Sequence, residues 1–275
     1  MSAWLTDANR LRMVRIVEVR DENPRVKTFT FYDPVCGWAR PGQFVMVWVP
    51  GVDEVPMSLS SINVDGRCSI TVKRVGEATE ALHGKSAGDL IGVRGPFGNG
   101  FTLAQGNVLI VGGGTGIACL LPLTEALLQG PSRITLLLGG KTEEEILFKE
   151  RLRTLSSTGR MRILFATEDG SLGFKGVVTE LMEEILAKER FDAAYTCGPE
   201  GMMHQVFQLT ERHGIPLQAS LERIIRCGIG ICGSCLVGRF RICRDGPVLS
   251  SEQLREVVGE FGRFRRDFDG RWVGV

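Results

Sequence analysis

Short runs of alternating or β-branched hydrophobic residues fill the first part of the chain. They lie at 14–19, 26–32, 43–49, 67–75 and 90–94, with turn-forming Gly, Pro, Asp and Asn residues between them. Alternation with a period of two is typical of strands that bury one face. Closely spaced short strands separated by such turns indicate an antiparallel barrel or sandwich. We therefore predict an N-terminal antiparallel β-barrel over residues 1–103, with helical periodicity only near 77–84.

From Asn107 onward, longer apolar strands alternate with helix-like stretches. Residues 108–111 form a continuous apolar run, which is typical of a strand buried in a parallel sheet. Further strands are predicted at 133–138, 161–166, 192–196 and 215–221. Helices are predicted up to about 129, from a capping box at 142–145, at 177–189 and at 199–213. This alternation predicts a parallel α/β domain over residues 104–222.

The remaining residues, 223–275, are too few for another large domain and are predicted to form a small C-terminal one. They contain a cysteine-rich loop, a Gly-Pro turn and an amphipathic stretch at 250–261 that predicts a helix.

Composition and charge narrow the class of protein. The 275 residues are 43% hydrophobic and 24% charged, which is ordinary for a folded globular protein. There are 33 Lys and Arg residues and 32 Asp and Glu residues, so the formal net charge is +1, without the basic excess of an electrostatic nucleic-acid binder. No apolar stretch approaches the ~18 residues that cross a bilayer, and charges interrupt the first twenty positions where a signal peptide needs an apolar core. We expect a cytoplasmic protein that binds neither nucleic acid nor a membrane.

Eight cysteines are unusual in such a chain, because a disulfide framework is not expected in a reducing compartment. Four of them are clustered: Cys227, Cys232, Cys235 and Cys243. Their spacing, C-x4-C-x2-C followed by a fourth cysteine, is the plant-type spacing for a [2Fe–2S] cluster. Glycines between them let the backbone wrap closely around a cluster and direct N–H groups at its sulfurs. Structural zinc is the alternative, although zinc sites usually have two C-x2-C-like pairs and only one is present here.

A glycine-rich turn, Gly-Gly-Gly-Thr-Gly at 112–116, follows the strand at 108–111 and opens a helix. Such a turn presents backbone N–H groups and a helix N-terminus to a pyrophosphate, although Ile117 departs from G-x-G-x-x-G. A second loop at 197–202 also lies between a strand and a helix. Open α/β sheets bind ligands beyond the carboxyl ends of their strands, so both loops are predicted to face one crevice. The alternative for the second loop is an ordinary turn with Pro199 at the first helical position.

The order of these motifs resembles that of the ferredoxin–NAD(P) reductase-like flavoproteins. In that family a flavin barrel precedes an α/β nicotinamide domain that carries G-G-G-x-G and C-G-P-x-x-M. With the C-terminal cysteine motif added, the chain resembles more narrowly the electron transfer subunits of NAD-linked, two-subunit dihydroorotate dehydrogenases of pyrimidine biosynthesis. The resemblance covers essentially the whole chain.

The resemblance implies an FAD site in the barrel. The family signature Arg-Pro-x-Ser corresponds to residues 55–58, so Val55 replaces a cationic phosphate contact and Lys73 is the expected substitute. The family's G-x-G-T turn corresponds to residues 76–79, with Ala78 where Gly is common. The implied FAD contacts are Pro56, Met57, Ser58, Thr71, Val72, Lys73, Gly76, Ala78 and Thr79.

The resemblance also implies a site for NAD(H) in the α/β domain. The implied contacts are Gly113, Gly114, Thr115, Gly116, Asp169, Cys197, Gly198, Pro199 and Glu200. The loop at 167–171 is acidic, and an acidic group favours an unphosphorylated ribose, so NAD is predicted over NADP.

The resemblance implies a catalytic partner subunit that contains FMN and oxidises dihydroorotate, in a heterotetramer with two of each chain. Electrons would pass through the [2Fe–2S] cluster held by the four cysteines to FAD and then to NAD+. Because the cofactors carry this chemistry, no catalytic acid or base is expected in this chain.

Other functions stay open at this point. The subunit of an NADH-dependent ferredoxin:NADP reductase is similar but has Asp at one cluster position, where this chain has Cys227. A sulfhydrogenase-type subunit and a zinc-stabilised binding module are further alternatives. The tail at 261–272 mixes aromatic residues and arginines, which are enriched at interfaces, so it either contacts a partner or packs on its own domain.

Overall fold

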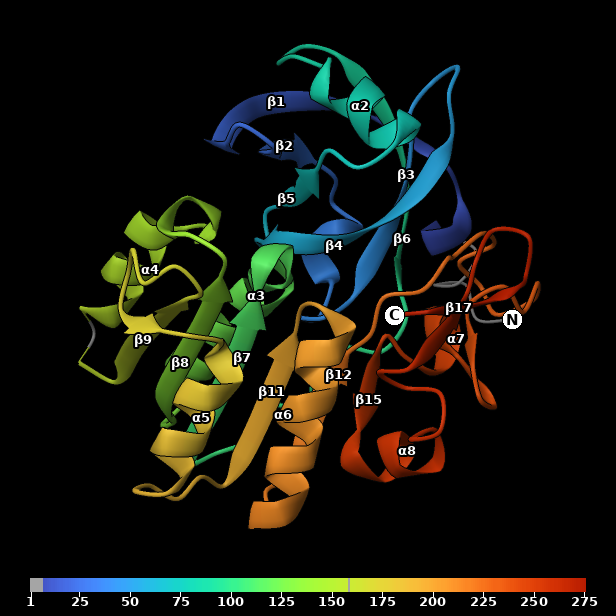
Figure 1. Ribbon diagram of the computed structural model, residues 1–275. Helices are drawn as coiled ribbons and strands as arrows, with labels where there is room; N and C mark the ends of the chain where they lie inside the picture. The colour runs from blue at the N-terminus through green and yellow to red at the C-terminus, as the bar shows by residue number, and fades with distance from the viewer. Residues whose placement is uncertain (1–6, 158) are drawn as a thin grey trace.

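The computed structural model describes residues 7–157 and 159–275, and its first part is a closed barrel in the strand order β1-β2-β5-β4-β3-β6 (Figure 1). All neighbouring barrel strands are antiparallel. The elements are β1 (Arg12–Asn23), β2 (Val26–Tyr32), η1 (Cys36–Trp38), β3 (Phe44–Trp48), β4 (Glu54–Ile62), β5 (Arg67–Lys73), α2 (Glu77–His83) and β6 (Leu90–Phe97). The predicted barrel and the helix near 77–84 are confirmed, whereas β4 was not predicted.

The second part is a seven-stranded sheet in the order β10-β9-β8-β7-β11-β12-β15. Six strands are parallel, and β15 joins the edge antiparallel to β12. The elements are β7 (Asn107–Gly113), η2 (Gly114–Gly116), α3 (Ile117–Gln129), β8 (Arg133–Gly140), η3 (Glu143–Glu145), α4 (Lys149–Ser156), β9 (Met161–Thr167), β10 (Phe174–Lys175), α5 (Val178–Leu186), β11 (Ala193–Cys197), α6 (Glu200–His213) and β12 (Leu217–Ser220). The predicted parallel α/β arrangement is confirmed.

Both faces of this sheet are covered, which explains its continuous apolar strands. In β7, Leu109 and Val111 pack in one buried layer with residues of α5 and α6. Val108 and Ile110 pack in the opposite layer with residues of α3 and with Leu152 of α4. Helix α3 also contacts β4, so it joins the sheet to the barrel.

The prediction that a helix begins at 142–145 is wrong, because the helix begins several residues later, at Lys149. Residues 143–145 form only the 3-10 turn η3, and Thr142 makes no side-chain cap. Phe148 then takes a left-handed conformation with φ of 59°, which breaks any continuous helix, and α4 begins at Lys149. The side chains of Ile146, Leu147 and Phe148 are buried, and this packing outweighs the local helix signal.

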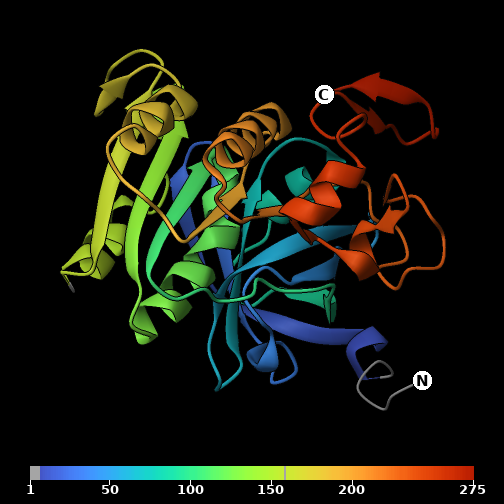
Figure 2. The same cartoon turned by 90° about the horizontal axis from the view of Figure 1, so that it is seen from below.

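The C-terminal part lies at the β12 edge of the sheet, on the side opposite β9 (Figures 1 and 2). Its elements are β13 (Leu236–Val237), β14 (Phe240–Arg241), α7 (Ile242–Asp245), β15 (Val248–Ser250), α8 (Ser251–Glu256), β16 (Phe264–Arg266) and β17 (Trp272–Gly274). The helix predicted at 250–261 is confirmed only in its first half, where Ser250 accepts a hydrogen bond from the backbone N–H of Gln253. The tail forms the β16–β17 hairpin, which was not predicted.

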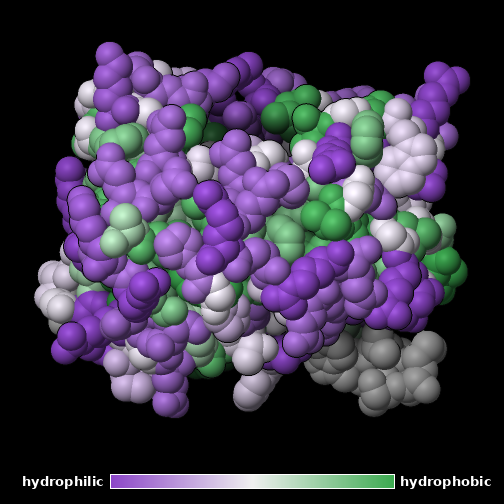
Figure 3. Space-filling model, turned by 60° about the horizontal axis from the view of Figure 1, so that its bottom comes forward, coloured by the Kyte–Doolittle hydropathy of each residue, from purple (hydrophilic) through white to green (hydrophobic). Residues whose placement is uncertain are grey.

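The surface is mostly polar on the face shown in Figure 3, where hydrophobic residues appear in separate patches. In the described part of the chain, none of the helices combines the length and the apolar character needed to span a bilayer.

Candidate functional site

A cavity of about 380 Å³ lies between the barrel and the carboxyl end of the α/β sheet. The barrel residues predicted from the FAD signature largely face it: Pro56, Met57, Ser58, Thr71, Lys73 and Thr79. Residues Thr115, Gly116 and Cys197 close it from the α/β side. The family resemblance implies that FAD binds between these two parts of the chain, so we call this space the flavin cavity.

The other predicted flavin contacts do not line this cavity. Val72 is fully buried in the barrel core, because neighbouring strand residues point to opposite faces and Thr71 and Lys73 face outward. Gly76 and Ala78 belong to the loop and first turn of α2. Thr79 holds that loop, since its hydroxyl accepts hydrogen bonds from the N–H groups of Val75 and Gly76, both 2.9 Å.

The two glycine-containing loops of the α/β sheet lie in direct contact. Strands β7 and β11 are neighbours, with Cys197 paired to Gly112. A Cβ on Gly113 would lie 2.6 Å from Sδ of Met202, and one on Gly116 would clash with the backbone carbonyl of Cys197. The backbone contact makes glycine necessary at position 116, and a side chain at position 113 would have to displace Met202. The two loops therefore lie at one place, as predicted.

A second cavity of about 210 Å³ opens over these loops. Seven of the residues predicted to contact NAD(H) line it: Gly113, Gly114, Thr115, Gly116, Gly198, Pro199 and Glu200. Cys197 instead faces the flavin cavity, and Asp169 lines neither cavity. Asp169 is exposed beyond the end of β9, where hydrogen bonds from Ser171 lower its pKa.

The carboxylate of Glu200 is fully engaged. It forms a buried ion pair with Arg223, with oxygen–nitrogen distances of 2.5 and 2.8 Å, and it accepts the backbone N–H of Gly262 at 2.9 Å. The side chains of Glu200 and Arg223 are 9% and 2% exposed. Glu200 therefore fastens the start of α6 to the C-terminal part while lining the second cavity.

Three of the four clustered cysteines, Cys227, Cys232 and Cys235, lie in a loop without regular structure, and Cys243 lies in the short helix α7. Cys235 and Cys243 are buried, Cys227 is half-buried and Cys232 is exposed. The loop depends on left-handed glycines, with φ of 75° at Gly228 and 80° at Gly230. The N–H of Gly230 donates to Sγ of Cys243 at 3.1 Å, which confirms the expected direction of an N–H toward sulfur.

The thiols interact chiefly in two pairs. Hydrogen bonding with Cys243 is the main cause that lowers the pKa of Cys235, and it correspondingly raises that of Cys243. Burial opposes ionisation of Cys227, but hydrogen bonds from the backbone and side chain of Cys232 and from nearby N–H groups lower its pKa. Among residues 7–157 and 159–275, no three His, Cys, Asp or Glu side chains converge as ligands of a single ion. Two thiol pairs can supply the two cysteine ligands that each iron of a [2Fe–2S] cluster needs.

Two family models match parts of the chain. The oxidoreductase NAD-binding domain matches residues 110–208, and the iron–sulfur cluster binding domain of dihydroorotate dehydrogenase B matches residues 222–255. The first match spans both glycine loops, and the second contains all four clustered cysteines.

Curated relatives extend the match over almost the whole chain. A probable dihydroorotate dehydrogenase B (NAD(+)) electron transfer subunit from Methanocaldococcus jannaschii is 44% identical over 94% of this chain and 96% of its own length. The chain belongs to this family of electron transfer subunits. A further member, from Methanothermobacter thermautotrophicus, is 44% identical over 96% of each chain.

Solved structures agree with this family assignment. The structure of an NADH-dependent reduced ferredoxin–NADP oxidoreductase matches with a TM-score of 0.80 and 32% identity, covering 90% of this chain and 92% of that one. A ferredoxin NADP+ reductase from Neisseria gonorrhoeae, with 21% identity, a TM-score of 0.64 and coverage of 74% and 92%, shares the fold. The subunit thus has a ferredoxin–NADP reductase-like fold with an iron–sulfur binding segment at its C-terminal end.

Sequence reasoning missed two charged residues at this site. Glu222 lines both cavities, and Arg223 lines the flavin cavity and pairs with Glu200. They come shortly after β12, which ends at Ser220, in the segment that leads to the cysteine loop. Their position at the carboxyl end of a predicted strand was the available signal, because functional side chains of such sheets lie there.

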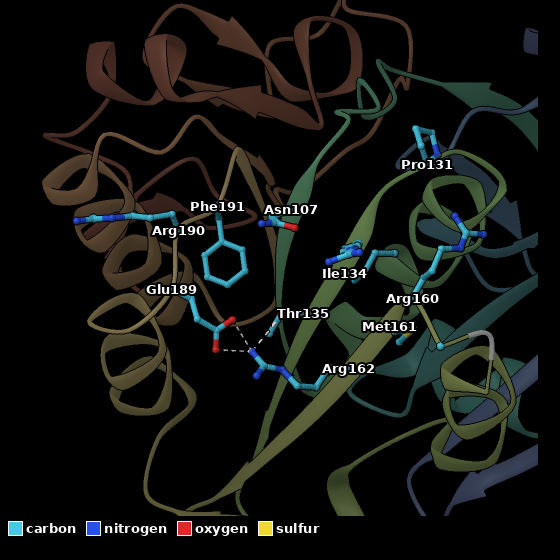
Figure 4. Close-up of a pocket in the computed structure, with 12 residues that line it drawn as sticks. Asn107, Pro131, Ile134, Thr135, Arg160, Met161, Arg162, Glu189, Arg190 and Phe191 are labelled. Atoms are coloured by element: carbon cyan, nitrogen blue, oxygen red, sulfur yellow. Dashed lines mark hydrogen bonds and ion pairs between the residues drawn. The ribbon is translucent and has the colours of Figure 1, made fainter.

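A hollow of about 870 Å³, larger than either of the two cavities above, lies at the opposite end of the sheet (Figure 4). Residues at the amino ends of β7, β8 and β9 line it, among them Asn107, Arg133 and Arg162. Arg162 is held by both carboxylate oxygens of Glu189 at 2.9 Å and by Thr135 at 3.3 Å. None of the predicted cofactor residues lies there, so the size of this hollow does not mark the functional site of the subunit.

Proposed function

We propose that this subunit passes electrons from a partner that oxidises dihydroorotate to NAD+, through a [2Fe–2S] cluster and FAD. One observation carries the proposal: residues on either side of the cysteine motif line the flavin cavity. Ile225 precedes Cys227 by two positions, Pro247 follows Cys243 by four, and both line the cavity that the barrel and the glycine loops enclose. The three predicted binding regions thus meet at one junction.

The described residues fit the groups they would hold. The thiol pairs Cys227–Cys232 and Cys235–Cys243 would bind the irons. The FAD would lie in the 380 Å³ cavity against Pro56, Met57, Ser58, Thr71 and Lys73, with Val72, Gly76, Ala78 and Thr79 shaping the barrel strand and loop beside it. The NAD(H) contacts would be Gly113, Gly114, Thr115, Gly116, Asp169, Cys197, Gly198, Pro199 and Glu200.

The chain divides accordingly into three proposed domains: 1–103 for FAD, 104–222 for NAD and 223–275 for the cluster. A bound flavin can exchange electrons singly or in pairs, which is the chemistry needed between a one-electron cluster and a two-electron nicotinamide. The residues of the chain hold the three groups at one junction and close the space between them with packed side chains.

The proposed partner is a catalytic subunit that contains FMN, assembled with this chain as a cytoplasmic heterotetramer of two copies each. The relatives' designation as electron transfer subunits supports a catalytic partner. The exposed Cys232, beside Ile231 with 77% exposure, leaves one edge of the cysteine loop open for an electron donor.

The test separates the roles of the two subunits. The purified chain, loaded with flavin and cluster, should oxidise NADH with a one-electron dye but should not oxidise dihydroorotate. Addition of the catalytic partner should give dihydroorotate-dependent formation of NADH, and removal of the cluster by iron chelation should abolish it. Fast oxidation of dihydroorotate by the isolated chain would contradict this division of labour.

A second candidate is supported by the solved structure with 32% identity, which is an NADH-dependent ferredoxin–NADP oxidoreductase. In that case the partner would be a larger iron–sulfur protein. Copurification of the native partner decides between them, because an FMN protein and a multi-cluster protein differ in absorption spectrum and iron content.

A further inference from the structure

Two aromatic rings fill the space between the cysteine loop and the flavin cavity. Phe97 ends β6 and Phe44 begins β3, and the two are direct cross-strand neighbours. Their ring centroids are 5.9 Å apart with an interplanar angle of 51°, and each residue is 3% exposed. Phe44 is also the cross-strand neighbour of Ser58 and lines the flavin cavity. The pair therefore reaches the cavity at its Phe44 end.

The other end of the pair touches the cysteine loop. A Cβ on Gly228, the residue after Cys227, would lie 3.2 Å from Cε2 of Phe97 and 3.2 Å from Cγ of Met46. The backbone of Gly228 therefore lies against the Phe97 ring, where a side chain would be tightly packed. Phe44, Phe97, Cys235 and Cys243 belong to one buried apolar cluster, with Cys227 packed against it.

Polar contacts hold the loop on this ring. Arg94 donates to the carbonyl oxygen of Cys227 at 3.4 Å, and its guanidinium lies 5.7 Å from the Phe97 ring centroid. Glu54 fixes Arg94 through bonds of 2.7 and 2.5 Å. Both partners are largely buried, with 16% and 23% of their side chains exposed, so the arrangement is well fixed.

A second set of contacts holds the turn that follows Phe97. The backbone N–H of Asn99 donates to the carbonyl oxygen of Gly246 at 2.5 Å, and its side-chain amide donates to the carbonyl oxygens of Arg244 and Asp245. These acceptors directly follow Cys243. Together with the contact of Arg94, these bonds fasten the barrel end that carries Phe97 to the chain beside Cys227 and beside Cys243.

We propose that Phe97 and Phe44 form the packed bridge through which electrons cross between the cluster and the flavin cavity. The two phenylalanines act as positioning residues: they fill the gap and fix the cysteine loop against the barrel. This inference rests on the proposed function, because it requires a cluster at the cysteines and a flavin in the cavity.

The electron balance of the step is simple. One NADH gives NAD+, one proton and two electrons to the flavin. One of these electrons crosses the bridge and reduces one ferric iron of the oxidised cluster to ferrous iron, and the other stays on the flavin until the cluster has passed its electron on. Electron tunnelling is faster through close-packed atoms than across a gap of the same width. A smaller side chain at position 97 leaves atoms of Gly228 and Phe44 without partners and opens such a gap.

The experiment compares three variants of the loaded chain in rapid mixing with NADH under anaerobic conditions. Phe97→Leu shortens the bridge, Phe97→Tyr keeps the ring, and Phe101→Leu is the matched control. Phe101 is 5% exposed and lies near the same end of the barrel, but its ring packs on Tyr195 at 5.6 Å and not on the cysteine loop. Flavin bleaching and the electron spin resonance signal of the reduced cluster are followed separately.

We expect Phe97→Leu to slow the appearance of the cluster signal by about tenfold, which equals about 1.4 kcal/mol in an apparent barrier. Flavin bleaching by NADH and the reduction potential of the cluster should stay unchanged, and Phe97→Tyr and Phe101→Leu should behave like the unaltered chain. Equal rates of cluster reduction in the unaltered chain and in Phe97→Leu would overturn the inference, as would a shifted cluster potential that accounts for the slower rate. Failure of NADH to reduce the cluster in the unaltered chain would instead overturn the proposed function.

Discussion

At the scale of single residues, Glu222 lines both the cavity between the barrel and the sheet and the cavity over the glycine loops. The residue is exposed to these cavities, yet protein surrounds its carboxyl on several sides, and this surrounding protein is the main cause that raises its pKa. The charge of Glu200 adds to the shift. Arg265 and Arg223 face the same carboxyl and oppose the shift in part. The folded chain therefore holds the proton of Glu222 more firmly than the unfolded chain does.

The sign of the stability change follows from this raised pKa. The contribution of Glu222 to stability is fully present below the unfolded pKa of about 4.3 and is lost as pH rises through the folded pKa. Glu222→Gln should therefore raise the free energy of unfolding at pH 8 and leave it unchanged near pH 4, as measured by urea denaturation across this range. Glu184→Gln, which changes an exposed carboxylate on α5 that lines neither cavity, is the control and should leave the profile unaltered. A stability gain that is the same at pH 4 and pH 8 would contradict the assignment.

At the scale of elements, the strands and loops that were predicted correctly are those whose own residues show a clear pattern of hydrophobic positions or glycines. The apolar run of β7 and the glycines after it identified both a buried strand and its loop. The alternating runs of β2 and β5 identified the barrel, since their inward residues, such as Phe29 and Ile70, are fully buried.

The missed elements have physical reasons in particular residues. In β4, residues 56–58 line the flavin cavity. Its sequence therefore lacks the regular alternation of hydrophobic and polar residues that a strand between core and solvent shows, and the strand was missed. Strand β15 has three residues and is fixed by its pairing with β12, a long-range contact that no local pattern reveals. Glu222 and Arg223 were missed for the same reason, because their place between two cavities depends on how the barrel and the sheet pack.

The ion pair between Glu200 and Arg223 tests how the elements are joined, because it ties the start of α6 to the segment after β12. Removal of one partner of a buried pair leaves a charge without compensation, so Glu200→Gln should lower the free energy of unfolding by about 3 kcal/mol. Glu189→Gln disrupts the more exposed pair with Arg162 and should cost about 1 kcal/mol or less. Urea denaturation of both variants measures the difference, and a smaller loss for Glu200→Gln than for Glu189→Gln would show that this pair does not hold the junction.

At the scale of the whole molecule, the cysteine loop and the tail hairpin share one side. Arg226, next to Cys227, donates to the carbonyl oxygen of Phe268 in the hairpin turn at 2.7 Å. Phe268 is 74% exposed, Phe264 50% and Trp272 51%. An exposed aromatic group of this kind beside the open edge of a cluster site is suited to contact a protein partner, because aromatic residues and arginines are enriched at interfaces.

The tail hairpin is therefore expected to contribute to binding of the catalytic partner. Trp272 is held in place by Arg266, whose guanidinium lies 4.4 Å from the ring centroid, so its ring is presented with little loss of side-chain freedom on binding. Phe264→Ala and Trp272→Ala should each weaken the complex by about tenfold or more, the range of central aromatic contacts, in a titration calorimetry measurement. Trp38→Ala removes a ring that is 77% exposed on the η1 turn of the barrel and serves as the control. Unchanged affinity of both tail variants, with the cluster intact, would mean that the hairpin packs on its own domain and that the partner approaches the cluster from another side.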